Sequence, residues 1–193
     1  MKRIFLVDIE NVGKSFLKGI EKLTISDEII VCNNRTVRDD FSRAIREGLS
    51  RTKAIVKKFH IENANKNAMD FHIMMQLGYM IAENGNSAEY YIVSNDRGFD
   101  VANHFAGNNH INAKIRRIAT LEANFAEEER INNMTTILTE LLPEYSKKVV
   151  KIVQQGIDAS KTTEELHNFL QNHLRRDFRC IYPKVKCFVE CRG

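Results

Sequence analysis

Long apolar runs are absent from this 193-residue chain. Nowhere do about 18 apolar residues follow one another, which is the length that a membrane-spanning helix needs. The opening stretch, MKRIFLVDIENVG, has a basic start and a short apolar run, but it lacks the longer run and the small-residue cleavage site of a signal peptide. We therefore expect a cytoplasmic protein that makes no membrane contact, with the apolar run forming its first strand.

Cysteine and proline are also scarce. The four cysteines form no CxxC pair, so their spacing is not that of a recognisable zinc finger. Reduced cytosolic thiols are the favoured interpretation. A zinc site is the alternative for the histidines and cysteines near the C-terminus, which are His167, His173, Cys180, Cys187 and Cys191. With two prolines and no Gly/Ser-rich linker, the parts of the chain are expected to pack together.

The remaining composition is that of a globular protein, with 43% hydrophobic and 28% charged residues and a net charge of +4. Basic residues cluster in two stretches. Residues 43–58 carry six Lys/Arg and one Glu, and residues 174–193 carry six Lys/Arg and two acids. Arg116 and Arg117 add a further pair. Such patches are either solvated helix faces or, if they converge, a surface that attracts a phosphate backbone.

Short apolar runs alternate with helical patterns through the first two thirds of the chain. Strands are expected at 4–7, 28–32, 54–59, 90–94 and 113–118, and helices at 16–22, 39–49, 68–83 and from about 98. This alternation predicts an α/β fold with a mostly parallel central sheet and helices on both faces. The helix at 68–83 is expected to bury the apolar stripe formed by Phe71, Met74, Met75, Gly78, Ile81 and Ala82.

After about residue 125 the pattern contains helices only, at 127–142, 143–160 and 162–176. The last of these opens with TTEE, which resembles a capping box. We therefore expect two domains, an α/β domain over 1–125 and a small α-helical C-terminal domain or extension over 126–193.

Carboxylates follow the expected strands. Asp8 ends the first strand, Asp96 and Asp100 follow the fourth, and Asp70 lies near the start of the helix after the third. If strands one and four are neighbours, these acids converge at one sheet edge, where ligands of parallel sheets bind. Crowded acids raise one another's pKa values, and a hard divalent cation such as Mg²⁺ or Mn²⁺ relieves that repulsion with oxygen ligands.

Each acid also has a plainer interpretation. Asp96 is suited to cap a helix, and Asp70 and Asp100 are suited to complement helix dipoles in first turns. Asp8 is the hardest to explain in this way, because a charge flanked by IFLV and Ile9 is expensive to bury without a partner.

Three motifs together resemble the NYN branch of the PIN-like nuclease superfamily. They are VDIENVG with Asp8, Glu10 and Asn11, KNAMDF with Asn67 and Asp70, and IVSNDRGFD with Ser94, Asp96 and Asp100. The resemblance covers roughly residues 1–125, and TTEELHNFLQNHL is similar to the helical tail of some bacterial members. One departure is Gly98, because the family signature has a second Asp at that position. Asp100 is the candidate substitute.

The resemblance implies a Rossmann-like PIN fold and a metal-dependent ribonuclease, an endonuclease that leaves 5′-phosphate and 3′-hydroxyl ends. Asp8, Asp70, Asp96 and Asp100 would hold Mg²⁺ or Mn²⁺, while Asn11 and Ser94 would orient these ligands or the scissile phosphate. RNA is the expected partner, and the candidate residues for phosphate contact are Lys14, Lys66 and Arg97.

Two other functions are alternatives. The first is a catalytically inactive RNA-binding protein of the same fold, for which the Gly98 departure is the reason. The second is a phospho-acceptor or phosphatase with Asp8 as nucleophile, but no suitable Lys follows a later strand and the DxD pattern is absent. The helical tail is open to RNA docking, homodimer formation or a protein partner.

Overall fold

The chain divides into two compact units, Met1–Ala126 and Glu127–Gly193. The computed structural model describes residues 1–34, 39–61 and 67–190, with the backbone alone at 33–34, 39–42 and 60. Two buried clusters of apolar side chains lie in the first unit, one on each face of a sheet, and a third lies in the second unit. Each unit therefore has its own buried core.

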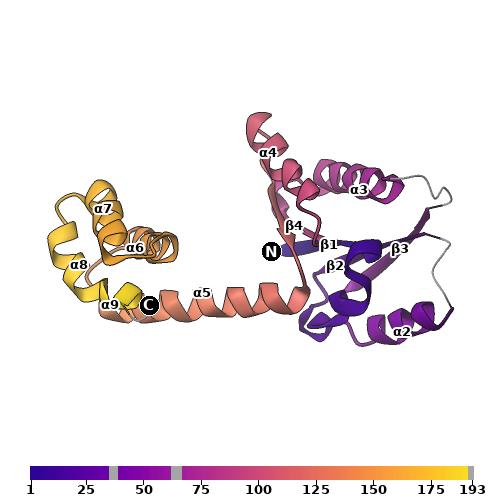
Figure 1. The fold of residues 1–193 in the computed structure, drawn as a ribbon, viewed down its shortest axis with the longest axis horizontal. Helices are drawn as coiled ribbons and strands as arrows, with labels where there is room; N and C mark the ends of the chain where they lie inside the picture. The colour runs from indigo at the N-terminus through magenta and orange to yellow at the C-terminus, as the bar shows by residue number, and fades with distance from the viewer. Residues whose placement is uncertain (35–38, 62–66, 191–193) are drawn as a thin grey trace. The chain divides into compact units, whose positions relative to one another are not determined.

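The first unit is built on a five-stranded sheet in the order β3-β2-β1-β4-β5, and every neighbouring pair is parallel. The predicted α/β architecture with a parallel sheet is thus confirmed (Figure 1). The strands are β1 (Lys2–Asp8), β2 (Glu28–Asn34), β3 (Ile55–Ile61), β4 (Ala88–Val93) and β5 (Lys114–Ile118).

The strand order reverses at β1, which lies between β2 and β4. The chain runs outward from β1 through β2 to β3, and then crosses to the other side of β1 to form β4 and β5. Such a reversal opens a crevice at the C-terminal ends of the two strands that flank it. Asp8 ends β1 and pairs with Cys32 of β2, while Val7 pairs with Val93 at the end of β4.

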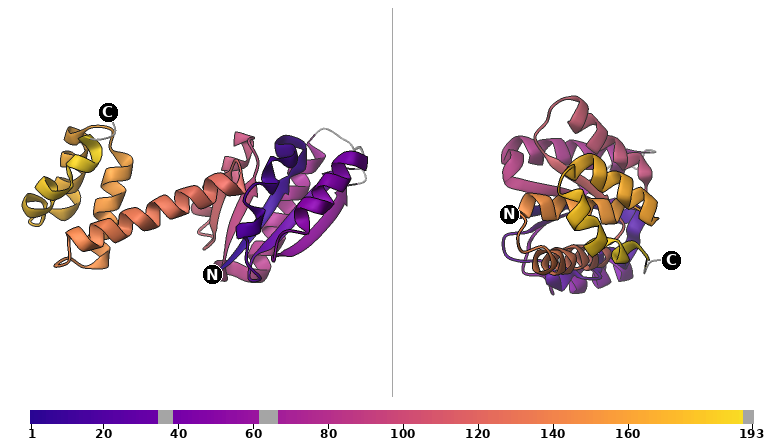
Figure 2. Two further views of the ribbon diagram at one scale, coloured as in Figure 1. Left: turned by 90° about the horizontal axis from the view of Figure 1, so that it is seen from below. Right: turned by 90° about the vertical axis from the view of Figure 1, so that its left-hand side faces the viewer.

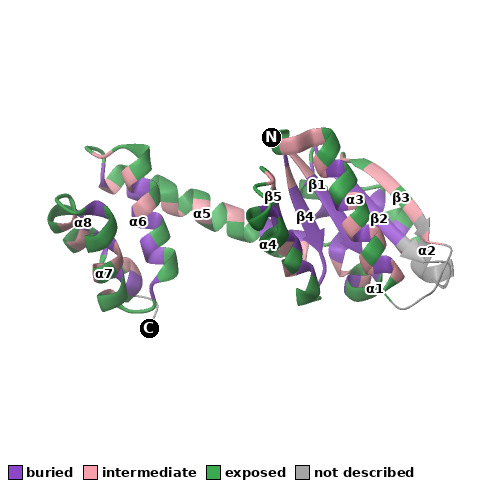
Figure 3. Ribbon diagram, turned by 90° about the horizontal axis from the view of Figure 1, so that it is seen from above, coloured by how far each residue is buried: buried purple, intermediate pink, exposed green. Residues whose placement is uncertain are grey.

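Helices cover both faces of this sheet, and α2 and α3 lie on opposite sides of it (Figures 1 and 2). These helices are α2 (Asp39–Leu49), α3 (Ala68–Asn84) and α4 (Val101–Asn108). Alternate strand residues face opposite sides, so each strand supplies two cores. The core shared with α3 and α4 contains Leu6, Cys32 and Ile92, and the core on the other face contains Phe5, Val31 and Tyr91. The central strands β1 and β4 are accordingly mostly buried (Figure 3).

The segment expected as one helix at 16–22 is different. It follows the short helix α1 (Ile9–Val12) and forms two 3₁₀ segments, η1 (Gly13–Leu17) and η2 (Ile20–Lys22). Gly19 separates them with φ +82°, and a Cβ there would stand 3.0 Å from the backbone of Glu122. The close approach of Glu122, whose N–H donates to Lys18 O, therefore requires a glycine and interrupts the helix.

The buried face predicted for α3 is only partly right, because Met74 and Ile81 pack against the core while Phe71, Met75, Gly78 and Ala82 are exposed. The helix buries Met69, Ile73, Leu77 and Met80 against the sheet. Phe71 and Met75, which belong to the predicted stripe, are 68% and 76% exposed. Because α3 has apolar residues on more than one face, spacing alone does not identify the face that meets the sheet.

The second unit is helical. Helix α5 (Leu121–Leu141) begins in the first unit, and α6 (Lys147–Ala159), α7 (Thr163–Leu174), α8 (Phe178–Val185) and α9 (Cys187–Glu190) follow. Thr162 caps α7 by accepting a hydrogen bond from Glu165 N–H, as the TTEE motif predicts. Within the described parts of the chain, no helix is both long and apolar enough to cross a membrane.

Candidate active site

Ser94 is the centre of the polar network that follows β4. It is fully buried, and its hydroxyl donates to Asp8 Oδ2 at 2.8 Å and accepts from Asp96 N–H at 3.0 Å. Its backbone N–H donates to Ile118 O in β5 at 3.0 Å. One small hydroxyl therefore links the end of β1 to the loop that carries Asp96, and this link fixes the Asp8 carboxylate in one orientation.

Asp8 is 3% exposed, which is unusual for a carboxylate at the end of an apolar strand. Burial raises the pKa of Asp8, and the charges of Asp70 and Glu10 raise it further. Hydrogen bonds from Ser94 and from the backbone N–H of Asn11 act in the opposite direction without cancelling that rise. Asp8 is thus a carboxylate whose negative charge the surrounding residues leave under-compensated.

Asp70 and Asp96 complete the group of nearby acids. Asp70 lies in the first turn of α3, where partial burial raises its pKa and the charge of Asp96 raises it further. Asp96 precedes the 3₁₀ segment η4 (Arg97–Asp100), and its Oδ1 accepts from Gly98 N–H at 2.7 Å. The structure therefore places Asp70 within electrostatic range of both Asp8 and Asp96, while Ser94 links Asp8 to the backbone of Asp96.

Asn11 ties the β1 loop to the β4 loop. Its side-chain Oδ1 accepts from Asn95 N–H at 3.0 Å, while its own backbone N–H donates to Asp8. Asn11 thus contacts both Asp8 and the loop after β4. Asn95 is not among the site residues predicted from the sequence. The signal for Asn95 was its place between Ser94 and Asp96, where the backbone has to turn away from the sheet.

Asp100 has a different environment. Arg117, from β5, donates to its two oxygens at 2.8 and 3.3 Å and also donates to Ser94 O at 3.2 Å. This guanidinium lowers the pKa of Asp100, in contrast to the raised values of Asp8 and Asp70. The predicted metal role of Asp100 stays a prediction. In this structure its carboxylate is bound to Arg117. The sequence indicates Arg117 only as part of the basic pair Arg116 and Arg117.

The predicted RNA-contacting residues are spread out. Arg97 is exposed directly after Asp96. Lys14 lines a separate polar pocket of about 470 Å³ together with Lys18 and Arg51. Lys66 lies outside the described residues. Of the three, Arg97 is therefore the one that the described structure brings beside the acids.

The donor set suits a hard cation. Asp8, Asp70 and Asp96 offer carboxylate oxygens. Burial, and then repulsion between neighbouring acids, raises the pKa values of Asp8 and Asp70, and a divalent cation would offset both effects. In the part of the chain that the structure describes, no three or more His, Cys, Asp or Glu side chains form a group that could hold a metal ion. Mg²⁺ does not require one, because it is usually held by one or two carboxylates together with waters and phosphate oxygens.

The cysteines are poorly suited to this chemistry. Burial, with the added charge of Asp8, raises the pKa of Cys32 to about 12, so this thiol stays protonated. Cys180 and Cys187 are free and exposed in the second unit, and Cys191 lies outside the described residues.

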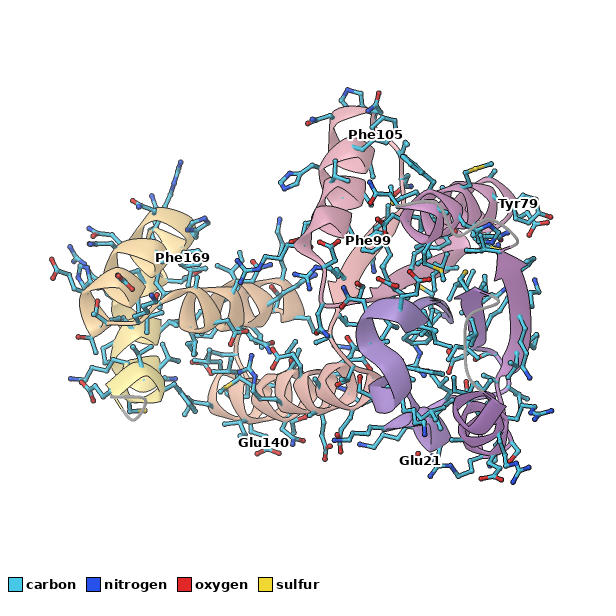
Figure 4. The ribbon with its side chains drawn as sticks, turned by 45° about the vertical axis from the view of Figure 1, so that its right-hand side comes forward. Glu21, Tyr79, Phe99, Phe105, Glu140 and Phe169 are labelled. Carbon is cyan, nitrogen blue, oxygen red and sulfur yellow. The ribbon has the colours of Figure 1, made fainter. Side chains whose placement is uncertain are left out.

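A largely apolar pocket of about 210 Å³ adjoins the acids. Asp70 and Asp96 form part of its lining, and the remainder comes from the start of α3 and from the loop that leads into α4. Those other lining residues are Phe71, Met74, Gly98, Phe99 and Val101. Figure 4 labels Phe99 near the base of α4 and Phe105 farther along that helix.

Comparison with known proteins gives one family match. The model of the PIN domain matches residues 2–116, more than half of the chain. No curated protein matches. Among solved structures, the chain is similar to "Enterococcus italicus Csm6 bound to cyclic hexa-2'-fluoro-hexa-dAMP", with 13% identity and a TM-score of 0.35, over 98% of this chain and 53% of that one. The chain thus spans about half the length of that protein. On the family match, the chain belongs to the PIN domain family.

Proposed function

We propose that this chain is a metal-dependent endoribonuclease of the NYN branch, with Asp8, Asp70 and Asp96 as its metal-binding residues. Membership in the PIN domain family supports a nuclease-type function. The observation that carries the finer proposal is the group of three acids at the β1–β4 crevice, two of which have raised pKa values. Uncompensated acids at such a position are typical of functional sites.

The proposed reaction is hydrolysis of an RNA phosphodiester bond, which leaves a 5′-phosphate and a 3′-hydroxyl. Bound Mg²⁺ or Mn²⁺ would supply activation of the attacking water and neutralisation of the phosphate charge. No side chain has to act as the nucleophile. The chain's own contribution is to hold the carboxylates in position and to orient the substrate.

Ser94 and Asn11 carry out that positioning. Ser94 donates to Asp8 and accepts from the Asp96 backbone, so one hydroxyl sets the relative positions of two proposed ligands. Asn11 holds the loop after β4 through Asn95. Arg117 supports the same loop through Ser94 O while it binds Asp100. Arg97, exposed beside Asp96, is the proposed contact for a flanking phosphate.

The alternative function is RNA binding without cleavage. It is favoured by Gly98, which stands where the related signature has an acid, and by the ion pair that engages Asp100. Both features reduce the number of carboxylates that are available to a cation. Metal binding without turnover would separate this alternative from the enzyme.

Cleavage of end-labelled RNA tests the proposal, with Mg²⁺, Mn²⁺ or EDTA and with analysis of the product ends. Asp8→Asn and Asp96→Asn should each lower the rate by at least about 100-fold, since even outer partners of metal ligands are worth about 10- to 100-fold. Glu140→Gln, at an exposed carboxylate of α5 labelled in Figure 4, is the matched control. Equal cleavage by all variants would contradict the proposal.

A further inference from the structure

Large apolar side chains are exposed on neighbouring parts of α3 and α4. Phe71 is 68% exposed, and Val101 and Phe105 of α4 are 57% and 58% exposed. Exposed apolar surface that gathers in one region commonly marks a binding site. The buried residues of α3 already meet the sheet, and Phe71 is not among the residues that form or pack against that core.

The pocket beside the acids lies within this apolar region. Its lining joins two carboxylates, Asp70 and Asp96, to the side chains of Phe71, Met74 and Phe99. Met74 also lines a second apolar pocket of about 200 Å³, which continues between α3 and α4. The first pocket therefore has a charged end at the proposed reaction centre and apolar walls beyond it.

We propose that this pocket binds one unpaired nucleobase next to the scissile phosphate, and that Phe71 is the surface on which the base stacks. The inference rests on the proposed function, because the metal-binding acids define where the scissile phosphate lies. Apolar walls offer no favourable contact to a second phosphate group. A base presents a flat apolar face instead, and bases in single strands stack on aromatic side chains.

Fluorescence of a base analogue tests this directly. Asp8→Asn protein, which is not expected to cut, is titrated with single-stranded RNA that carries 2-aminopurine at successive positions. One position is expected to be quenched on binding, and Phe71→Ala in the same background should remove that quenching and raise Kd about 5- to 150-fold. Phe71→Trp should retain both. Met75→Ala is the matched control, since Met75 is 76% exposed on the same helix but does not line the pocket.

The outcomes separate the two proposals. Unchanged quenching and Kd in Phe71→Ala would overturn the base site and leave the nuclease standing. Quenching that depends on Phe71, in a protein whose wild type cuts nothing, would support the base site and contradict the nuclease. If Phe71→Ala instead converts a dimer into a monomer without affecting RNA, the pocket binds a second copy and the inference is wrong. Absence of any RNA binding would overturn both.

Discussion

Replacing Asp8 by Asn should abolish cleavage and yet stabilise the metal-free fold. The Asp8 carboxylate is 3% exposed and its pKa is raised, so its ionised form is less favourable in the folded chain than in the unfolded one. Asn has the same shape without the charge. We expect the free energy of unfolding in EDTA at pH 7 to rise by about 0.5 to 2 kcal/mol, the gain that a single stabilising substitution commonly gives.

The predicted stabilisation by Asp8→Asn should also depend on pH. A carboxyl whose pKa is raised on folding destabilises the folded chain only once it ionises. The advantage of Asp8→Asn should therefore shrink as pH falls through the folded pKa and vanish below the ordinary value of 3.8. Urea denaturation followed by far-UV circular dichroism measures it.

Asp27→Asn is the matched control for that experiment. Asp27 is also buried, at 1% exposure, but hydrogen bonds from Arg3 and Thr24 lower its pKa despite the opposing effect of burial. Loss of its charge should destabilise the fold. If Asp8→Asn destabilises as Asp27→Asn does, the charge of Asp8 is compensated and the reasoning is refuted.

Three further predictions concern Arg117, Arg3 and Gly98. Arg117→Ala should lower cleavage about 10-fold, because it releases Asp100 and Ser94 O, while Arg116→Ala should not. Arg3→Ala should cost about 3 kcal/mol at pH 7, since it leaves the charge of Asp27 buried without its cationic partner. This loss should shrink as pH falls through the pKa of Asp27, and denaturation at pH 7 and pH 3 measures it. Gly98→Ala should lower kcat several-fold without unfolding the protein, because its Cβ would stand 3.2 Å from Asp96 Oδ1.

Much of the fold follows from local patterns in the sequence. The apolar runs that end at Asp8 and before Ser94 predicted β1 and β4, and the helix at Asp39–Leu49 has the predicted bounds. The sequence does not predict the strand order, because nothing local in it specifies that β4 pairs with β1. The expectation that the acids converge therefore depended on assuming that pairing. Once that pairing is known, the acids at their ends have to be close.

The features that the sequence did not predict depend on partners far along the chain. The face of α3 that is buried is decided by where the sheet lies, and both Phe71 and Ile73 are apolar enough to have been the buried residue. The break at Gly19 depends on Glu122, which is about a hundred positions away. The ion pair of Asp100 with Arg117 joins the loop after β4 to β5, and no local pattern in the sequence predicts it.

The most direct test of the central claim is Mn²⁺ binding followed by electron paramagnetic resonance. We expect wild type and Glu140→Gln to bind Mn²⁺ with equal affinity, and Asp8→Asn, Asp70→Asn and Asp96→Asn each to lose most of that affinity. Equal binding by all five proteins would contradict the claim that these three aspartates hold the cation.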